Sequence, residues 1–146
     1  MGKPNDDGIP VIDLAGTNQS QVAQQLVHAF QSIGFATLIN HGVDEIVKSD
    51  AFTASANFFR LPTATKLQYK YQGHESNRGY IPFGSEKFEV AKSADRKETY
   101  DIGKEGEVDA ETPWPSELEG DFKEPLLRYF NDMNDLYLRL LRLVAI

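Results

Sequence analysis

The stretch GFATLINHGV, residues 34–43, separates two helical patterns and decides the fold class of the first half of the chain. The apolar run at residues 35–40 is typical of a strand that is buried on both faces. Asn40 can end that strand, Gly42 permits an unusual backbone angle, and His41 can hydrogen-bond the nearby backbone. We therefore expect a strand and then a sharp turn, with a structural role for the NHG triplet.

A strand and a helix are predicted before this stretch. The β-rich run IPVIDL, residues 9–14, is bounded by glycines and is typical of a strand. Apolar residues then recur at helical spacing on one face: Val22, Leu26, Ala29, Phe30 and Ile33. Three residues can cap the start of this helix: Thr17, Asn18 or Ser20. Gly34 stands where a left-handed C-terminal cap belongs.

A second helix and two further strands are predicted after it. The inward stripe of the helix is Val43, Val47, Ala51, Ala54 and Phe58. Asp44 and Glu45 lie in its first turn, and Pro62 ends it. A short helix and a polar loop follow, and then RGYIPFG at residues 78–84 and KETYDIG at residues 97–103 are typical of strands.

The chain closes with an acidic surface loop at residues 104–121 and a long helix. The apolar stripe of this helix is wide: Phe122, Leu126, Tyr129, Phe130, Met133, Leu136, Tyr137, Leu140, Leu141 and Val144. Arg139 and Arg142 lie on its other side, and no Gly or Asn stop signal precedes Ile146. We expect the partner of this stripe to lie outside the chain. The fold class is mixed α/β (α+β), in a single domain over residues 1–146.

Composition narrows the function. The 146 residues carry a net charge of −7 and no cysteine, and no run of 18 apolar residues occurs. An acidic chain is a poor match for nucleic acid or an anionic membrane, so neither is expected as a partner. Disulfides and thiolate ligands are excluded, which fits a reducing compartment, and we expect a cytoplasmic protein.

The histidines do not form a recognisable metal motif. Non-haem iron sites often use two histidines and one carboxylate, but His28, His41 and His74 belong to no His-x-Asp, His-x-Glu or His-Glu-x-x-His pattern. We expect His28 to be partly buried and hydrogen-bonded. No metal ligand and no catalytic residue is predicted in this chain.

Five motifs in order resemble one family. IPVIDL, GFATLINHGV, FFRLP, RGYIPFG and DRKETYDIG resemble the N-terminal region of the 2-oxoglutarate- and iron(II)-dependent oxygenases, the isopenicillin N synthase-like family. The resemblance implies flanking helices plus the first strands of an incomplete double-stranded β-helix (jelly roll). It also implies that the iron ligands (His-x-Asp and a later His) and the Arg-x-Ser co-substrate grip lie downstream, in a C-terminal catalytic core that this chain lacks. Fe(II) and 2-oxoglutarate are then expected for a full-length enzyme and none for this chain.

The strand KETYDIG yields two candidate pocket residues. Alternation puts Glu98, Tyr100 and Ile102 on one face, which we expect to meet the helices, and Lys97, Thr99 and Asp101 on the other. The resemblance places this strand along the substrate pocket, so Thr99 and Asp101 are predicted to line it. An edge strand with an ordinary solvent face is the alternative.

Arg78 is the third candidate, because the resemblance places a substrate-carboxylate ligand near this turn and a guanidinium fork matches two oxygens. The alternative, which we favour slightly, is a surface arginine paired with Glu75 or Glu86. Gly79 beside it is expected to serve a close backbone approach or a positive φ.

Two functions remain open. The first is the N-terminal part of an oxygenase that hydroxylates or desaturates a small molecule, contributing scaffold and pocket wall and inactive alone. The second is a free-standing, non-catalytic relative that uses its exposed apolar helix face for dimerisation or another interaction.

Overall fold

A computed structural model describes residues 8–71, 77–85, 95–106, 111–118 and 120–145. The chain divides into two compact units. Unit 1 comprises Met1–Asp44 and Asn131–Ile146, and unit 2 comprises Glu45–Phe130. The last helix, α4 (Lys123–Val144), begins in unit 2 and ends in unit 1. In the described part of the chain, no helix is both long and apolar enough to cross a membrane.

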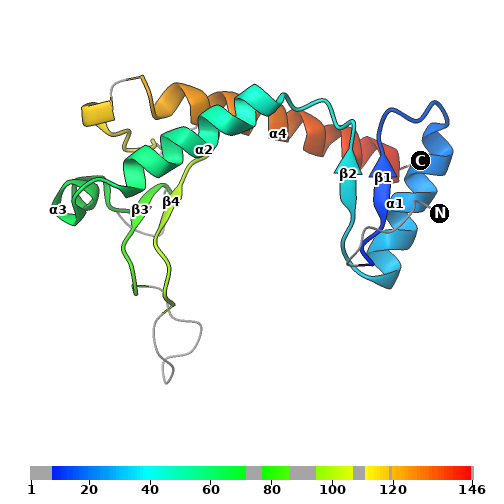
Figure 1. Cartoon of the computed structure of the whole chain (residues 1–146), viewed down its shortest axis with the longest axis horizontal. Coiled ribbons are helices and arrows are strands. Elements are labelled where there is room, and N and C mark those ends of the chain that lie inside the picture. Colours follow the sequence, from blue (N-terminus) through cyan, green and yellow to red (C-terminus); the bar gives the residue numbers. More distant parts are fainter. Residues whose placement is uncertain (1–7, 72–76, 86–94, 107–110, 119, 146) are drawn as a thin grey trace. The chain divides into compact units, whose positions relative to one another are not determined.

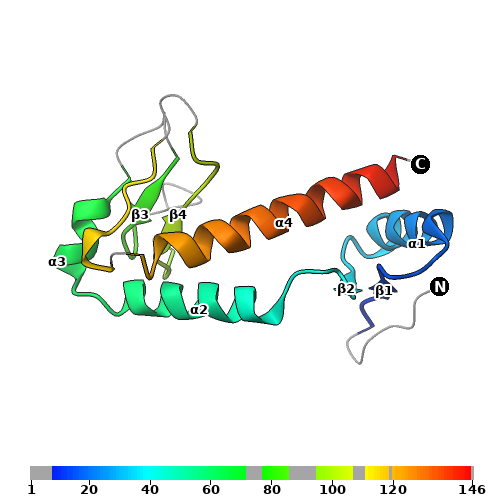
Figure 2. The ribbon, with the colours of Figure 1, turned by 90° about the horizontal axis from the view of Figure 1, so that it is seen from above.

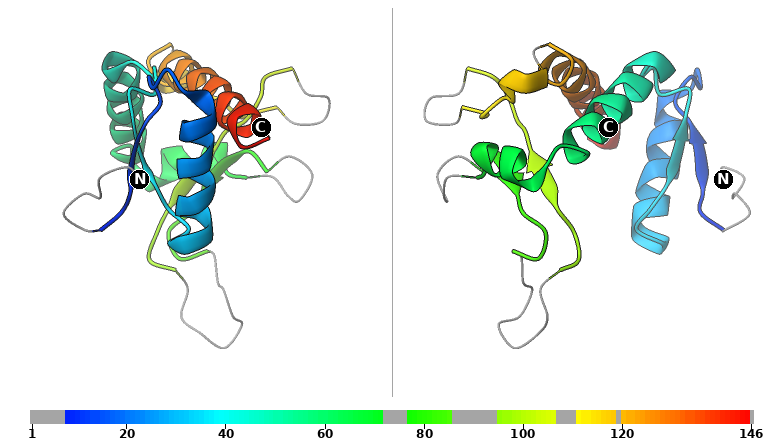
Figure 3. Two further views of the ribbon diagram at one scale, coloured as in Figure 1. Left: turned by 90° about the vertical axis from the view of Figure 1, so that its right-hand side faces the viewer. Right: turned by 60° about the vertical axis from the view of Figure 1, so that its left-hand side comes forward.

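Unit 1 is built on a strand–helix–strand segment. β1 (Val11–Asp13) and β2 (Thr37–Ile39) pair in parallel, and α1 (Gln19–Ser32) connects them and lies alongside them (Figure 1; Figure 3). The side chain of Asn18 accepts a hydrogen bond from the Gln21 amide at 3.1 Å and caps α1. Gly34 follows the helix with φ of 86°. The predicted caps are therefore confirmed, with Asn18 the one of the three candidates that acts.

The turn after β2 has the predicted structural role. Asn40 and Gly42 both have positive φ, 52° and 93°. The side-chain amide of Asn40 donates a hydrogen bond to Asp13 Oδ1 at 2.9 Å. The backbone amide of Val43 donates one to His41 Nδ1 at 3.1 Å. The bond from Asn40, followed by one from the Ala15 amide, lowers the pKa of Asp13. The NHG triplet thus joins the ends of the two strands.

Two burial predictions for unit 1 are wrong. β2 is not buried on both faces, because Phe35 and Ile39 are exposed. On α1, Val22, Leu26 and Ala29 are buried as expected, but Phe30 and Ile33 are exposed. The physical reason is that a two-stranded sheet has two faces and two edges, more than α1 can cover, so an apolar run alone overstated the burial.

Unit 2 contains two more helices and an antiparallel ribbon. Its elements are α2 (Glu45–Phe59), α3 (Thr63–Lys66), a 3-10 turn (Leu67–Tyr69), β3 (Gly79–Ile81), β4 (Thr99–Asp101), a second 3-10 turn (Ser116–Leu118) and the start of α4. β3 and β4 pair with Tyr80 opposite Tyr100. Four residues of the stripe predicted for this helix lie buried on α2, and the fifth, Val43, is buried just before the helix, in unit 1. These results confirm a mixed chain of helices and small sheets.

Aromatic rings form the core of unit 2. Figure 2 shows α2 running alongside the start of α4, and Phe58 is the central ring of the core. Its centroid lies 4.7 Å from that of Tyr100, 4.8 Å from Phe122 and 5.8 Å from Tyr80. Tyr100 therefore faces the helices, as the alternation of β4 predicts.

The acidic stretch before α4 is not simply a surface loop. Thr112 and Pro115 are buried, and the Trp114 ring lies 6.0 Å from that of Phe122. The Tyr100 hydroxyl donates to the Pro113 carbonyl at 2.6 Å. Its net acidity suggested exposure, whereas the prolines and the tryptophan pack this part of the stretch onto the core.

The stripe of α4 changes along the helix. Leu126 in unit 2 and Leu136 in unit 1 are buried as predicted, and Leu143, which the predicted stripe left out, is buried too. Four members of the predicted stripe there remain exposed: Met133, Tyr137, Leu141 and Val144. Arg139, expected on the solvent side, hydrogen-bonds the carbonyls of Leu14 and His41. The side of α4 that packs on unit 1 is therefore the one carrying Arg139, and an apolar face is left uncovered by described residues.

Gly79 is required by both backbone conformation and space, as predicted. Its φ is 110°, and a Cβ there would lie 2.7 Å from the Tyr69 carbonyl oxygen. We expect Gly79→Ala to lower the free energy of unfolding of unit 2 by about 2–3 kcal/mol, through backbone strain plus the clash. Urea unfolding followed by fluorescence of Trp114, the single tryptophan, measures it.

The matched control is Gly106→Ala. Gly106 also has positive φ, 79°, but a Cβ there has open space. Strain without a clash should cost about 1 kcal/mol. If the two variants lose the same free energy of unfolding, the close approach to Tyr69 does not contribute to the effect of Gly79→Ala.

Candidate functional site

The β3–β4 ribbon carries two of the predicted pocket residues, Thr99 and Asp101, and the third, Arg78, directly precedes β3. Thr99 pairs with Ile81, and Asp101 pairs with Gly79, which Arg78 directly precedes. Residues opposite one another in an antiparallel pair share a face, so Thr99 and Asp101 lie on the face away from Tyr80 and Tyr100. Both are half-buried. The ribbon thus brings Arg78 and Asp101 to the same end and leaves Thr99 two residues away along β4.

Arg78 is not a surface arginine. Its exposed fraction is 7%, which contradicts the favoured interpretation of a solvated surface pair. The guanidinium lies against the backbone of Gly103, where any side chain would overlap it. The sequence signal for this burial is Gly103, the last residue of KETYDIG. A glycine at this position leaves the space that the guanidinium occupies. Glu75 and Glu86, its proposed partners, lie outside the described residues.

An acidic side chain sits in the electrostatic reach of Arg78. Glu105 is bonded to Lys123, with 2.9 Å between Nζ and Oε2, and accepts from Trp114 Nε1 at 3.2 Å. The Lys123 hydrogen bond is the main cause of its lowered pKa, and the Arg78 charge adds to it. This end of the ribbon therefore combines a buried cation with a carboxylate kept ionised.

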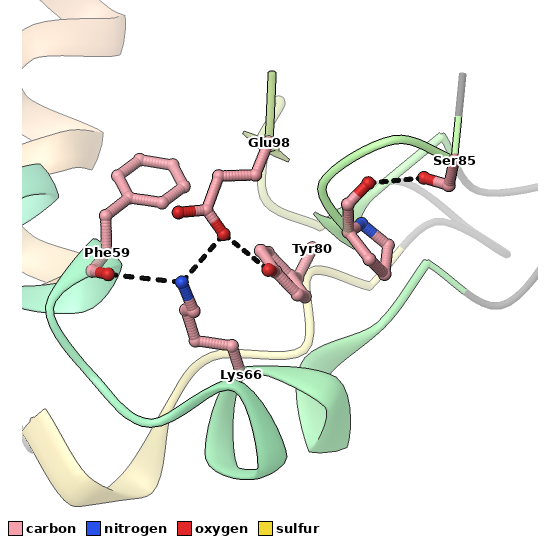
Figure 4. Close-up of polar contacts among 6 residues, drawn as sticks. Phe59, Lys66, Tyr80, Ser85 and Glu98 are labelled. Atoms are coloured by element: carbon pink, nitrogen blue, oxygen red, sulfur yellow. Dashed lines mark hydrogen bonds and ion pairs between the residues drawn. The ribbon is translucent and has the colours of Figure 1, made fainter. Parts of the chain in front are cut away.

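A polar cluster of Lys66, Tyr80 and Glu98, which the sequence does not predict, lies beside the ribbon. Lys66 Nζ lies 2.7 Å from Glu98 Oε2 and donates to the Phe59 carbonyl at 3.1 Å, while the Tyr80 hydroxyl donates to the same Glu98 oxygen at 2.5 Å (Figure 4). Lys66 is 5% exposed. The cluster ties α3 to the start of β4, directly before Thr99, and so fixes the strand that carries the candidate residues.

The cluster shifts the pKa of both acids in it. Burial raises the pKa of Tyr80 to about 12, and the bond to Glu98 adds to the shift. For Glu98, burial acts to raise the pKa, but the hydrogen bonds from Lys66 and Tyr80 and the Lys66 charge together lower it. At neutral pH Glu98 is therefore a carboxylate and Tyr80 a neutral phenol.

The histidines do not assemble a metal centre in the described part of the chain. His28 is exposed rather than partly buried, since it lies on the open side of α1. His41 uses Nδ1 on the Val43 amide, and His74 lies outside the described residues. Among the residues described, no three His, Asp or Glu side chains come together as a metal site. The donor set of a two-histidine, one-carboxylate iron site does not fit what these residues offer.

Two solved complexes share this fold. The full-length Neurospora crassa protein in complex with alpha-KG matches with a TM-score of 0.83 and 34% identity, over 97% of this chain and 48% of that one. The same protein with alpha-KG and thymine matches with a TM-score of 0.82 and 32% identity, over 97% of this chain and 49% of that one. The small sheets and flanking helices thus define the chain as resembling about half of a protein that binds alpha-KG, which is 2-oxoglutarate.

The family model described as "non-haem dioxygenase in morphine synthesis N-terminal" matches residues 9–120, and the chain belongs to this family. The 2-oxoglutarate-dependent dioxygenase citB of Monascus ruber is 30% identical over 94% of this chain and 47% of its own length. Feruloyl CoA ortho-hydroxylase 1 of Arabidopsis thaliana is 30% identical over 93% of this chain and 36% of its own length. The resemblance drawn from the five motifs is confirmed, and the chain spans about half or less of the length of these relatives.

Proposed function

We propose that the chain acts as the N-terminal part of an iron(II)- and 2-oxoglutarate-dependent oxygenase that hydroxylates or desaturates a small molecule. The chain supplies scaffold and one wall of the substrate pocket, and it does not turn over substrate alone. The iron ligands and the co-substrate grip belong to a C-terminal core. A cytoplasmic location is part of the proposal, in keeping with a chain that has no cysteine.

The structural match to the Neurospora crassa protein carries this proposal. Almost all of the chain superimposes on about half of a protein that holds alpha-KG and, in one complex, thymine. The uncovered face of α4 supports the same conclusion, because exposed apolar side chains at helical spacing mark a surface that binds another surface. We assign the catalytic core as the partner of Met133, Tyr137, Leu141 and Val144.

The β3–β4 ribbon is the proposed pocket wall. We infer that β3 and β4 are the first strands of a jelly roll that the catalytic core completes, and that Thr99 and Asp101 face the substrate. Arg78 is proposed to hold an anionic group of the substrate, since a buried guanidinium is desolvated and its fork suits a carboxylate. A complex with substrate would identify the group that Arg78 holds.

A chimera tests the proposal. We expect the 146-residue chain alone to show no stoichiometric Fe(II) binding in anaerobic calorimetry with 2-oxoglutarate, because its described residues assemble no donor set. Fused to the part of the Neurospora crassa protein that lies beyond the matched region, it should bind one Fe(II) and convert 2-oxoglutarate to succinate. Tight binding by the chain alone, or a folded chimera that cannot bind iron, would contradict the proposal.

The exposed α4 face also favours the second candidate, a free-standing interaction module. A discrete dimer of the isolated chain in sedimentation, dissociated by Tyr137→Glu or Leu141→Glu, would support it. A monomer whose solubility improves with the same substitutions fits an N-terminal part that lacks its core. Phe52, on α2 and 75% exposed, offers the control substitution Phe52→Glu.

A further inference from the structure

A cavity of about 390 Å³ lies in unit 1, remote in sequence from the β3–β4 ribbon. It is lined by the residues after β1, the first turns of α1 and the last turns of α4: Leu14, Ala15, Gly16, Gln19, Val22, Arg139, Arg142 and Leu143. Its volume is in the range of small-ligand pockets. Because all of these residues belong to unit 1, the cavity is formed by that unit alone.

The charge of this cavity is opposite to that of the chain. The protein carries −7 overall, yet the residues that line the cavity include two arginines and no acid. Arg139 and Arg142 are three residues apart on α4 and therefore lie on one side of the helix. Asp135 lies one turn before Arg139, beside a neighbouring hollow, but within the described part of the chain neither arginine forms an ion pair with a carboxylate.

The two arginines differ in how their guanidinium N–H groups are used. Arg139 uses two of its N–H groups on the backbone carbonyls of Leu14 and His41, which fixes its guanidinium at the ends of β1 and β2. Arg142 makes no such bond among the described residues, and its side chain is exposed beside the cavity. One guanidinium is thus held in place by backbone carbonyls, whereas no described residue bonds the other.

From this arrangement we propose that the cavity binds a small oxyanion, a carboxylate or a phosphate group, between Arg139 and Arg142. Two guanidinium groups in a cavity that no acid lines repel one another, and a bound oxyanion removes that repulsion while accepting charge-assisted hydrogen bonds. The apolar side chains of Leu14, Val22 and Leu143 accommodate the carbon portion of such a ligand. This inference concerns unit 1 alone and does not rest on the proposed function.

Amide NMR titration of the 146-residue chain tests it. Inorganic phosphate and acetate are added separately at constant ionic strength, and the Ala15, Gly16 and Gln19 amides are followed. We expect saturable shifts with at least one anion, and the responding arm identifies the class of ligand. Shifts that stay linear with both anions would overturn the proposal.

Substitutions of arginine test whether the anion binds at this cavity or responds only to the overall charge. Arg142→Gln should weaken binding roughly tenfold or more, and Arg142→Lys should weaken it less, because the charge remains but the fork is lost. Arg142 is exposed, so its replacement should leave amides distant from the cavity unchanged. Arg128→Gln removes the same charge from the same helix outside the cavity and should leave the affinity unchanged. Equal weakening by Arg128→Gln would show a general charge effect and overturn the site.

Discussion

Phe58→Ala lowers the free energy of unfolding of unit 2 by about 3–5 kcal/mol, the largest loss we expect from a single substitution in this chain. Phe58 is fully buried, with an exposed fraction of 0%. Its ring stacks on Phe122 at an interplanar angle of 24° and meets Tyr80 and Tyr100 edge to face. The substitution therefore removes at once the contacts of α2 with both strands of the ribbon and with Phe122, the residue directly before α4.

The size of this loss depends on how little the cavity can collapse. The surrounding rings are fixed by other bonds: Tyr100 donates to the Pro113 carbonyl and Tyr80 to Glu98. Rings held in this way cannot move to fill the space, so the cavity term adds to the lost transfer free energy.

Phe52→Ala is the matched control, because Phe52 lies on the same helix but is 75% exposed. We expect its effect to stay within about 0.5 kcal/mol. Urea unfolding followed by Trp114 fluorescence reports on this core directly, since the Trp114 ring lies 6.0 Å from that of Phe122. Similar losses for Phe58→Ala and Phe52→Ala would mean that the aromatic cluster does not hold unit 2 together.

The helices and turns were predictable because local chemistry determines them. The α2 stripe, the Asn18 cap, the left-handed Gly34 and the NHG turn each follow from residues a few positions apart. The order of elements β1–α1–β2 was also predictable, because the spacing of apolar residues differs clearly between strands and helices. Gly79 was recognised as special, although which backbone atom approaches it was not.

Long-range polar contacts were not predictable in the same way. Lys66 and Glu98 are 32 positions apart, and Arg139 and Leu14 are 125 apart. Nothing in the sequence near Lys66 or Arg139 distinguishes a cation that bonds the interior from a solvated one, since both periodicity and charge are local signals. The same limit explains Arg78: a guanidinium can be buried only where the backbone around it leaves room, here at Gly103.

The burial of apolar faces was overestimated for a different reason. Periodicity identifies which side of a helix prefers burial, but not whether a partner is present. Phe30 on α1 and Tyr137 on α4 both have the right spacing, yet both are exposed. That pattern is the one expected of a chain that spans about half the length of its relatives.

Glu98→Ala is the second substitution with a large expected effect, a loss of about 3 kcal/mol for unit 2. It leaves the ammonium of Lys66, which is 5% exposed, without its carboxylate. Breaking a buried pair costs about 3–5 kcal/mol, and the low end applies because the Glu98 side chain keeps 27% of its surface exposed. Tyr80 loses its acceptor in the same step.

A second variant separates the buried charge from simple loss of packing. Adding Lys66→Met to Glu98→Ala removes the uncompensated ammonium and should recover more than half of the loss. The control pair is Glu45 and Lys48, also a Lys–Glu pair at 2.5 Å but with Glu45 84% exposed. Glu45→Ala should cost no more than about 0.5 kcal/mol.

The pH dependence gives an independent check with a definite sign. The folded pKa of Glu98 lies below its ordinary value of 4.5, so the unfolded chain binds the proton more tightly. The stabilisation from this carboxylate is complete above pH 4.5 and is lost as the pH falls through the folded pKa. The difference in unfolding free energy between wild type and Glu98→Ala should therefore narrow below pH 4.5. A difference that stays constant down to about pH 3 would mean that Glu98 is not ionised against Lys66 in the folded chain, and that the cluster does not fix β4 through charge.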